Sequence, residues 1–161
     1  MKFSIENGCF AYDSSRTILE DVCVQLNPAE IMTVLGANGV GKTTLMKCML
    51  GLLKWTSGKS RVDGEDIRKM NTSQLWKRIG YVPQAKQAVF AYTVEEMVLL
   101  GRSAHLGMAK QPKAQDRQIA MDCLNEIGIG HLKDRLISRI SGGELQMVLI
   151  ARALATQPQM L

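Results

Sequence analysis

The stretch that decides the fold is GANGVGKT at residues 36–43, which fits the pattern GxxxxGK(S/T) in full. Glycines at this spacing let the backbone curl so that consecutive amides point at one anion, and a helix that starts there adds the positive end of its dipole. Ile31–Leu35 before the stretch is a short run compatible with a strand, and Thr43–Leu50 after it favours a helix that Gly51 ends. The sequence therefore predicts a phosphate-binding loop between a strand and a helix.

The polar residues of this loop have predicted roles around a bound phosphate. Lys42 would reach the β- and γ-phosphates of a nucleotide, Thr43 would give its hydroxyl to Mg²⁺, and Thr44 would add a phosphate contact. The backbone around the phosphate would come from Gly36, Asn38, Gly39 and Gly41. The loop alone leaves kinases, GTPases, helicases and transporters open as functional classes.

The rest of the chain changes from short strands to helices. Runs typical of strands are found at Lys2–Ile5, Val22–Leu26 and Ile79–Val82. Patterns typical of helices are found at Ser73–Arg78, Thr93–Leu100, 119–127 and about Gly143–Thr156. This order predicts an α/β core with a helical subdomain inserted near residues 86–140.

Composition narrows the function classes further. The chain has 161 residues, 46% hydrophobic and 22% charged, which is globular, and no apolar run approaches the roughly 20 residues of a membrane span. Its formal charge of +5 is spread along the sequence and only 5% of residues are aromatic, so we expect no nucleic-acid binding. The four cysteines and two histidines lack the spacing of a zinc site or a disulfide framework. These features favour a cytosolic protein.

Three further motifs carry a resemblance to a known family. ISGGE at residues 140–144 resembles the signature LSGGQ of ATP-binding cassette (ABC) ATPases, and the helix after it, with LQ at 145–146 and IARAL at 150–154, is similar to their signature helix. YVPQ at residues 81–84 is similar to their Q-loop. Ile140 replaces the usual leucine and Glu144 the commoner glutamine. The order and spacing match, so the resemblance covers essentially the whole chain.

The resemblance implies an α/β fold: a P-loop NTPase core with an N-terminal antiparallel β subdomain and an inserted helical subdomain. Residues 1–85 would form the nucleotide-binding core, 86–140 the helical subdomain, and 141–161 the signature helix and the start of the Walker B strand. The Walker B aspartate and the catalytic glutamate would lie beyond Leu161. We therefore expect the C-terminal part of the cassette to be missing and this chain alone to be inactive.

The resemblance also implies site residues outside the loop. Tyr12 would stack on adenine, and Gln84 would be the catalytic residue that binds Mg²⁺ or positions the attacking water. Ser141, Gly142 and Gly143 would meet the γ-phosphate of an ATP held by a second copy, in a head-to-tail dimer. The residues by themselves leave ordinary readings open: a core tyrosine, a solvated glutamine, and a capping box that simply starts a helix.

The implied function is that of an ATP-binding subunit that couples MgATP binding and hydrolysis to membrane import. Such a subunit would lie on the inner face of the cell membrane, with an integral-membrane permease and a substrate-binding protein as partners. GRSAHLG at residues 101–107 is similar to the GRxPHLG-like stretch of importers for iron-siderophores, haem and cobalamin, with Ala104 in place of proline. Two alternatives stay open: an ATP-binding module without turnover, and a soluble ABC protein of DNA repair or translation.

Overall fold

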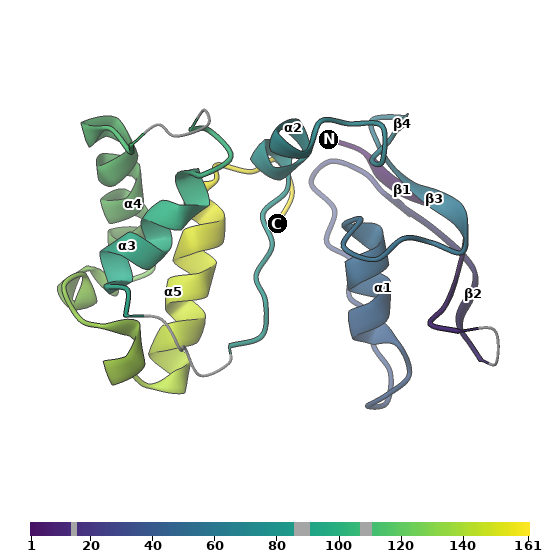
Figure 1. Ribbon diagram of the computed structural model, residues 1–161, viewed down its shortest axis with the longest axis horizontal. Coiled ribbons are helices and arrows are strands. Elements are labelled where there is room, and N and C mark those ends of the chain that lie inside the picture. The colour runs from purple at the N-terminus through teal and green to yellow at the C-terminus, as the bar shows by residue number, and fades with distance from the viewer. Residues whose placement is uncertain (14–15, 86–90, 107–110) are drawn as a thin grey trace. The chain divides into compact units, whose positions relative to one another are not determined.

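The computed structural model describes residues 1–13, 16–85, 91–106 and 111–161. The chain divides into two compact units, Met1–Asn71 and Thr72–Leu161. Figure 1 labels the helices and strands of each unit. None of the helices in these described ranges is both long and apolar enough to span a bilayer.

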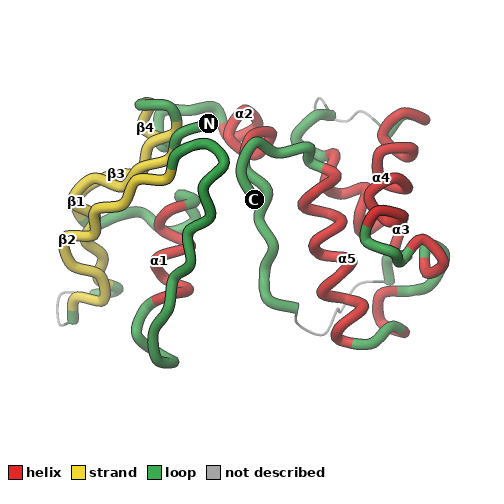
Figure 2. Tube along the Cα trace, turned by 180° about the vertical axis from the view of Figure 1, so that it is seen from behind, coloured by secondary structure: helices red, strands yellow, loops and turns green. Residues whose placement is uncertain are grey.

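The first unit is built on a four-stranded antiparallel sheet. Its strands are β1 (Phe3–Ala11), β2 (Thr17–Leu26), β3 (Ser57–Val62) and β4 (Glu65–Asp66), in the order β2-β1-β3-β4. Phe3 pairs with Leu26 on one side and with Val62 on the other. Helix α1 (Lys42–Met49) lies against one face of this sheet (Figures 1 and 2), and the Cys48 carbonyl accepts a hydrogen bond from the Ser60 hydroxyl. The predicted N-terminal antiparallel β subdomain is confirmed.

The hairpin between β3 and β4 was missed by the strand patterns, although the sequence carries its turn. Asp63 and Gly64 connect the two strands, with φ angles of 48° and 85°. Two consecutive positive φ angles characterise the tight hairpin turn that Asp-Gly favours. The dipeptide was therefore the signal that could have located β3 and β4.

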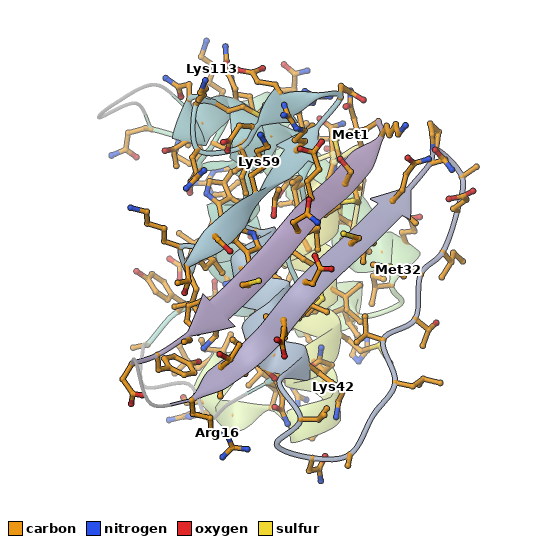
Figure 3. The ribbon with its side chains drawn as sticks, turned by 90° about the vertical axis from the view of Figure 1, so that its right-hand side faces the viewer. Met1, Arg16, Met32, Lys42, Lys59 and Lys113 are labelled. Carbon is orange, nitrogen blue, oxygen red and sulfur yellow. The ribbon has the colours of Figure 1, made fainter. Side chains whose placement is uncertain are left out.

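The strand predicted at Ile31–Leu35 is wrong for the chain as folded here. This segment, on which Figure 3 labels Met32, is extended but unpaired, and Ile31 and Leu35 are 96% and 86% exposed. A strand needs a neighbour for its backbone N–H and C=O groups. Within the described residues of the first unit no segment provides that neighbour, so the apolar run is an extended loop there.

The last predicted strand, Ile79–Val82, forms only an isolated parallel bridge between Ile79 and Met160. The Gly80 amide donates to the Met160 carbonyl at 2.8 Å, and the Met160 amide donates to the Arg78 carbonyl at 3.1 Å. A parallel pairing of this kind is what a strand beginning near Met160 requires. The Walker B assignment of Gln159–Leu161 stays a prediction.

The second unit is helical. Its elements are α2 (Thr72–Arg78), α3 (Val94–Leu99), η1 (Leu100–Arg102), α4 (Ala114–Glu126), η2 (Gly130–Leu132), η3 (Ile137–Arg139) and α5 (Gly142–Ala155). Its core joins α3, α4 and α5 with the turns between α4 and α5 (Figure 1) and contains Val94, Val98, Ala120, Leu124, Leu132, Ile137, Val148 and Ala151, all at most 2% exposed. The predicted helices and the helical subdomain are confirmed, while the proposed domain limits at residues 85 and 140 stay predictions.

The start of α3 is a capping box, which the T-x-x-E spacing of Thr93 and Glu96 in the sequence predicts. The Glu96 amide donates to the Thr93 hydroxyl at 3.2 Å, and the Thr93 amide donates to the Glu96 carboxylate at 2.8 Å. Two of the amides that a helix leaves without intrahelical partners are thereby satisfied. This feature depends only on residues three apart, which is why the sequence alone located it.

A buried polar junction joins η1 to α4 and to the end of α5. The Arg102 guanidinium donates to the Asp116 carboxylate at 3.0 Å and to the Ala155 carbonyl at 2.8 Å. Hydrogen bonding from the Lys113 amide, and then from Arg102, lowers the pKa of Asp116 below its usual value. Both charged groups therefore have partners inside the unit, as burial of charge demands.

Gly101 packs closely against α5 beside this junction, so a larger residue at position 101 tests the packing. A Cβ added there would collide with the Arg152 carbonyl, whereas one added at Gly142 meets no described atom within 4 Å. We expect Gly101→Ala to destabilise the protein by about 1–3 kcal/mol through overpacking. The control Gly142→Ala should leave stability unchanged or slightly higher, because alanine favours helix. Urea unfolding followed by circular dichroism measures both, and equal stability of the two variants would contradict the packing described here.

Candidate phosphate-binding site

The loop of residues 36–43 has the backbone conformation that its glycines allow. Gly39 and Gly41 have φ angles of 83° and 107°, in the left-handed region that side chains disfavour. The loop leads directly into α1 at Lys42, which Figure 3 labels. A substitution at either glycine would strain the backbone that shapes the loop.

The N-terminus of α1 is open to an anion. Gly41 occupies the N-cap and can provide no side chain, no described side chain caps this end, and the first turn carries no acidic residue. Thr43 and Asn38 are exposed beside it. Amides without partners, together with the helix dipole, favour a negatively charged ligand here.

Lys42 is held over the loop by the loop's own backbone. Its Nζ donates to the Gly36 and Ala37 carbonyls, each at 2.8 Å. The ammonium group therefore lies against the first two residues of the loop. An ammonium at this place adds a full positive charge to the dipole of α1.

Tyr12 comes close to the loop helix although 32 positions of sequence separate it from Thr44. Its hydroxyl lies 3.3 Å from the Thr44 hydroxyl, and its ring meets Phe10 edge to face with centroids 4.9 Å apart. The ring itself is 64% exposed. The core reading of Tyr12 is therefore wrong, since most of its ring remains open to solvent.

Gln84 lies in the second unit, on the loop after α2. Its side chain is exposed, and the next residue is fixed to α5 because the Ala85 amide donates to Gln146 Oε1 at 3.0 Å. The exposed amide of Gln84 is free to meet a ligand, which its predicted role requires. Gln84 belongs to the second unit, whereas the loop of residues 36–43 belongs to the first.

Ser141 caps α5 as the sequence predicts. The Glu144 amide donates to the Ser141 hydroxyl at 3.2 Å, and the Ser141 amide donates to the Glu144 carboxylate at 2.7 Å. The bond from that backbone amide is the main cause that lowers the pKa of Glu144. Gly142 and Gly143 are exposed, with no described atom near the place of a Cβ. The capping box is formed, and the two glycine amides remain accessible.

The structure thus brings Tyr12, Lys42, Thr43 and Thr44 together in the first unit. Gln84 and Ser141 lie in the second unit, each on an exposed surface. Among the described residues no cluster of three or more His, Cys, Asp or Glu side chains forms a metal site. An exposed Thr43 hydroxyl beside an open helix end fits Mg²⁺ that is bound together with phosphate, since this ion keeps several waters and few protein ligands.

The cysteines do not take part in this site. All four are free, and burial raises the pKa of Cys48 to about 11. A thiol with so high a pKa is a poor nucleophile at neutral pH. Cys48 therefore acts as a small core side chain on the buried face of α1.

The stretch at residues 101–107 is occupied with internal contacts. Arg102 forms the buried junction described above, His105 Nε2 lies 2.8 Å from the Thr156 carbonyl, and the Ala104 carbonyl accepts a hydrogen bond from Ser73 at 2.8 Å. Gly107 lies outside the described residues. These contacts give the stretch a structural role at the end of α5.

A groove of about 670 Å³ in the second unit was not anticipated. Trp76, Tyr81, Leu100, Leu106 and Arg152 are among the residues that line it. They come from four separate segments, and no local pattern relates them. Only the packing of these segments could have located the groove.

Comparison with known proteins agrees with this geometry. The family model for ABC transporters matches residues 19–161. The molybdate import ATP-binding protein MolC of Haemophilus influenzae is 37% identical over 96% of this chain and 56% of its own length. The hemin import ATP-binding protein HmuV of Methylobacillus flagellatus is 39% identical over 88% of this chain and 52% of its own length.

A solved structure extends the likeness to three dimensions. cbiO1 from Clostridium perfringens, part of the ABC transporter complex cbiONQ, superimposes with a TM-score of 0.79 at 29% identity. The match covers 97% of this chain and 62% of cbiO1, so the chain spans little more than half the length of its relatives. Because the family model covers residues 19–161, and the loop of residues 36–43, the antiparallel sheet and the capped helix α5 agree with it, this chain belongs to the ABC transporter family.

Proposed function

We propose that this protein binds MgATP at the loop of residues 36–43 and couples ATP binding and hydrolysis to import across a membrane. The observation that carries the proposal is the open N-terminus of α1 behind a loop that Gly39 and Gly41 hold in left-handed conformations. Such an end presents amides and a positive dipole to a triphosphate. The relatives named as ATP-binding proteins support it.

Within this proposal each residue of the first unit has a distinct task. Lys42 leaves its carbonyl partners to pair with the β- and γ-phosphates, and the amides of the loop bind the phosphate oxygens. Thr43 binds Mg²⁺, which when present neutralises charge on the phosphates. Tyr12 offers its exposed ring to the adenine.

The second unit would complete the reaction in a dimer. Gln84 orients the attacking water or contacts Mg²⁺, and Ser141 with Gly142 and Gly143 binds the γ-phosphate of an ATP held by a second copy. Ser141 can do so while capping α5, because its hydroxyl accepts from the Glu144 amide and keeps its own proton to donate. A head-to-tail pair of chains then encloses two nucleotides.

The relatives support a proposal for the membrane partner and for the cargo. We propose an integral-membrane permease as the membrane partner, a substrate-binding protein on the far side, and a position on the inner face of the membrane. The molybdate and hemin relatives support a metal-containing cargo, and within that class we favour an iron-siderophore, haem or cobalamin. Co-purification with a polytopic membrane protein supports this proposal, and co-purification with ribosomes or DNA contradicts it.

Replacing Lys42 tests nucleotide binding. Lys42→Ala should bind MgATP about 10- to 100-fold more weakly, because one charge-assisted contact is lost. Lys47→Ala, in the last turn of the same helix, is the matched control and should bind normally. Titration with a fluorescent ATP analogue measures both, and unchanged affinity in Lys42→Ala would refute the site.

Replacing Gln84 tests turnover separately from binding. In a form that extends over the full length of its relatives, Gln84→Ala should lower the rate of phosphate release by on the order of 100-fold, because a preorganised polar group is lost. Affinity for MgATP should change little. A variant that releases phosphate at the normal rate would exclude Gln84 from the reaction.

Replacing Ser141 tests the head-to-tail dimer. In the same extended form, Ser141→Arg should leave ATP binding to the isolated subunit intact and block ATP-driven dimerisation, since the bulky side chain obstructs the partner's nucleotide. Analytical ultracentrifugation with and without ATP measures the dimer. Loss of binding to the isolated subunit would instead assign Ser141 to its own subunit's site.

A further inference from the structure

The contact between Tyr12 and Thr44 joins the predicted base-binding ring to the phosphate-binding helix. The two hydroxyls are 3.3 Å apart, within hydrogen-bonding distance, and both residues belong to the first unit. Thr44 is 9% exposed and stands two residues after Lys42 on α1, whereas the Tyr12 ring is 64% exposed. A buried hydroxyl on a rigid helix therefore holds the tip of a ring that is otherwise open to solvent.

The remaining freedom of Tyr12 is restricted from its other side. Phe10, which is 6% exposed, meets the ring edge to face with an interplanar angle of 88°. The backbone just before Tyr12 is fixed as well, because the Ala11 amide donates to the Thr56 hydroxyl at 3.1 Å and the Thr56 amide to the Cys9 carbonyl at 2.9 Å. The backbone next to Tyr12 and the hydroxyl at the end of its side chain are therefore both held. The ring presents one fixed, exposed surface.

We propose that Thr44 is a positioning residue, whose hydroxyl orients the Tyr12 ring so that it is ready to stack on a planar base. The inference rests on the proposed nucleotide binding. An exposed tyrosine without this contact would sample several rotamers and lose that freedom on binding. The hydrogen bond removes this cost in advance, so the base-dependent part of nucleotide affinity depends on it.

The chemistry of a hydroxyl allows Thr44 to serve the phosphate at the same time. A threonine hydroxyl has one donor proton and two acceptor positions. Either hydroxyl can donate in this contact. When Thr44 accepts from the Tyr12 hydroxyl, it keeps its own proton for a phosphate oxygen. The orienting contact and the predicted phosphate contact of Thr44 are thus compatible. Their effects on affinity are separated by comparing a ligand that has a base with one that has only phosphates.

MgATP and magnesium tripolyphosphate provide that separation, because tripolyphosphate offers the phosphates without a base. Calorimetric titration of the chain with each ligand gives a ratio of the two dissociation constants, which measures the preference for the base. Tyr12→Phe keeps the ring and removes only the hydroxyl. We expect it to lower this preference about 2- to 10-fold and to leave tripolyphosphate affinity unchanged.

The variants of Thr44 then assign the effect to the hydrogen bond. Thr44→Val should lower the affinity for both ligands and should lower the preference for the base as Tyr12→Phe does. Thr44→Ser should retain that preference, because it keeps the hydroxyl. The double variant Tyr12→Phe, Thr44→Val should have no lower preference than Thr44→Val alone, since one hydrogen bond is lost only once. Circular dichroism checks that each variant is folded.

Different results would contradict different parts of this inference. An unchanged preference in Tyr12→Phe, or additive losses in the double variant, would overturn the positioning role while leaving nucleotide binding intact. Equal affinity of the unaltered chain for the two ligands would overturn the role of the Tyr12 ring itself. Binding of neither ligand would refute the proposed function together with this inference.

Discussion

The first turn of α1 carries backbone amides that no described side chain satisfies. The residues around this turn leave those amides open to a ligand. Gly41 at the N-cap cannot cap the helix, the turn lacks an acidic residue, and Lys42 adds a positive charge at the same end. An aspartate or serine at the cap would stabilise the helix and occupy the place of an anion. The loop thus forgoes a stabilising contact that most helices have, in favour of a ligand.

The N-terminus of α5 resolves the same problem differently. Ser141 and Glu144 satisfy two amides through the capping box, and hydrogen bonding lowers the pKa of Glu144, so the carboxylate is ionised at neutral pH. Gly142 and Gly143 keep the surface beside it open. The capping box satisfies this helix end without a ligand. In the proposed dimer, the exposed glycines and the serine proton would meet a phosphate held by the second copy. The contrast agrees with the proposal that one helix end binds nucleotide and the other completes the partner's site.

The stretch beginning at Gly101 connects α4 with the end of α5 in the helical unit. Gly101 allows close packing on α5, Arg102 pairs with Asp116 and reaches the Ala155 carbonyl, and His105 lies on the Thr156 carbonyl. The carbonyls at the end of α5 are groups that every helix leaves without intrahelical partners, and these side chains satisfy them. The motif that resembles importers for iron-siderophores, haem and cobalamin therefore has a packing role in the helical unit.

The sequence by itself determined the features that depend on near neighbours: the loop at residues 36–43, the capping boxes at Thr93 and Ser141, and the family. Each is a pattern within a few residues, so local chemistry suffices. Only the tertiary structure decided the contact of Tyr12 with Thr44, the partners of Arg102, and the unpaired state of Ile31–Leu35. These depend on which distant segments become neighbours. A strand most of all depends on such a neighbour, because its hydrogen bonds are made with another segment and not within itself.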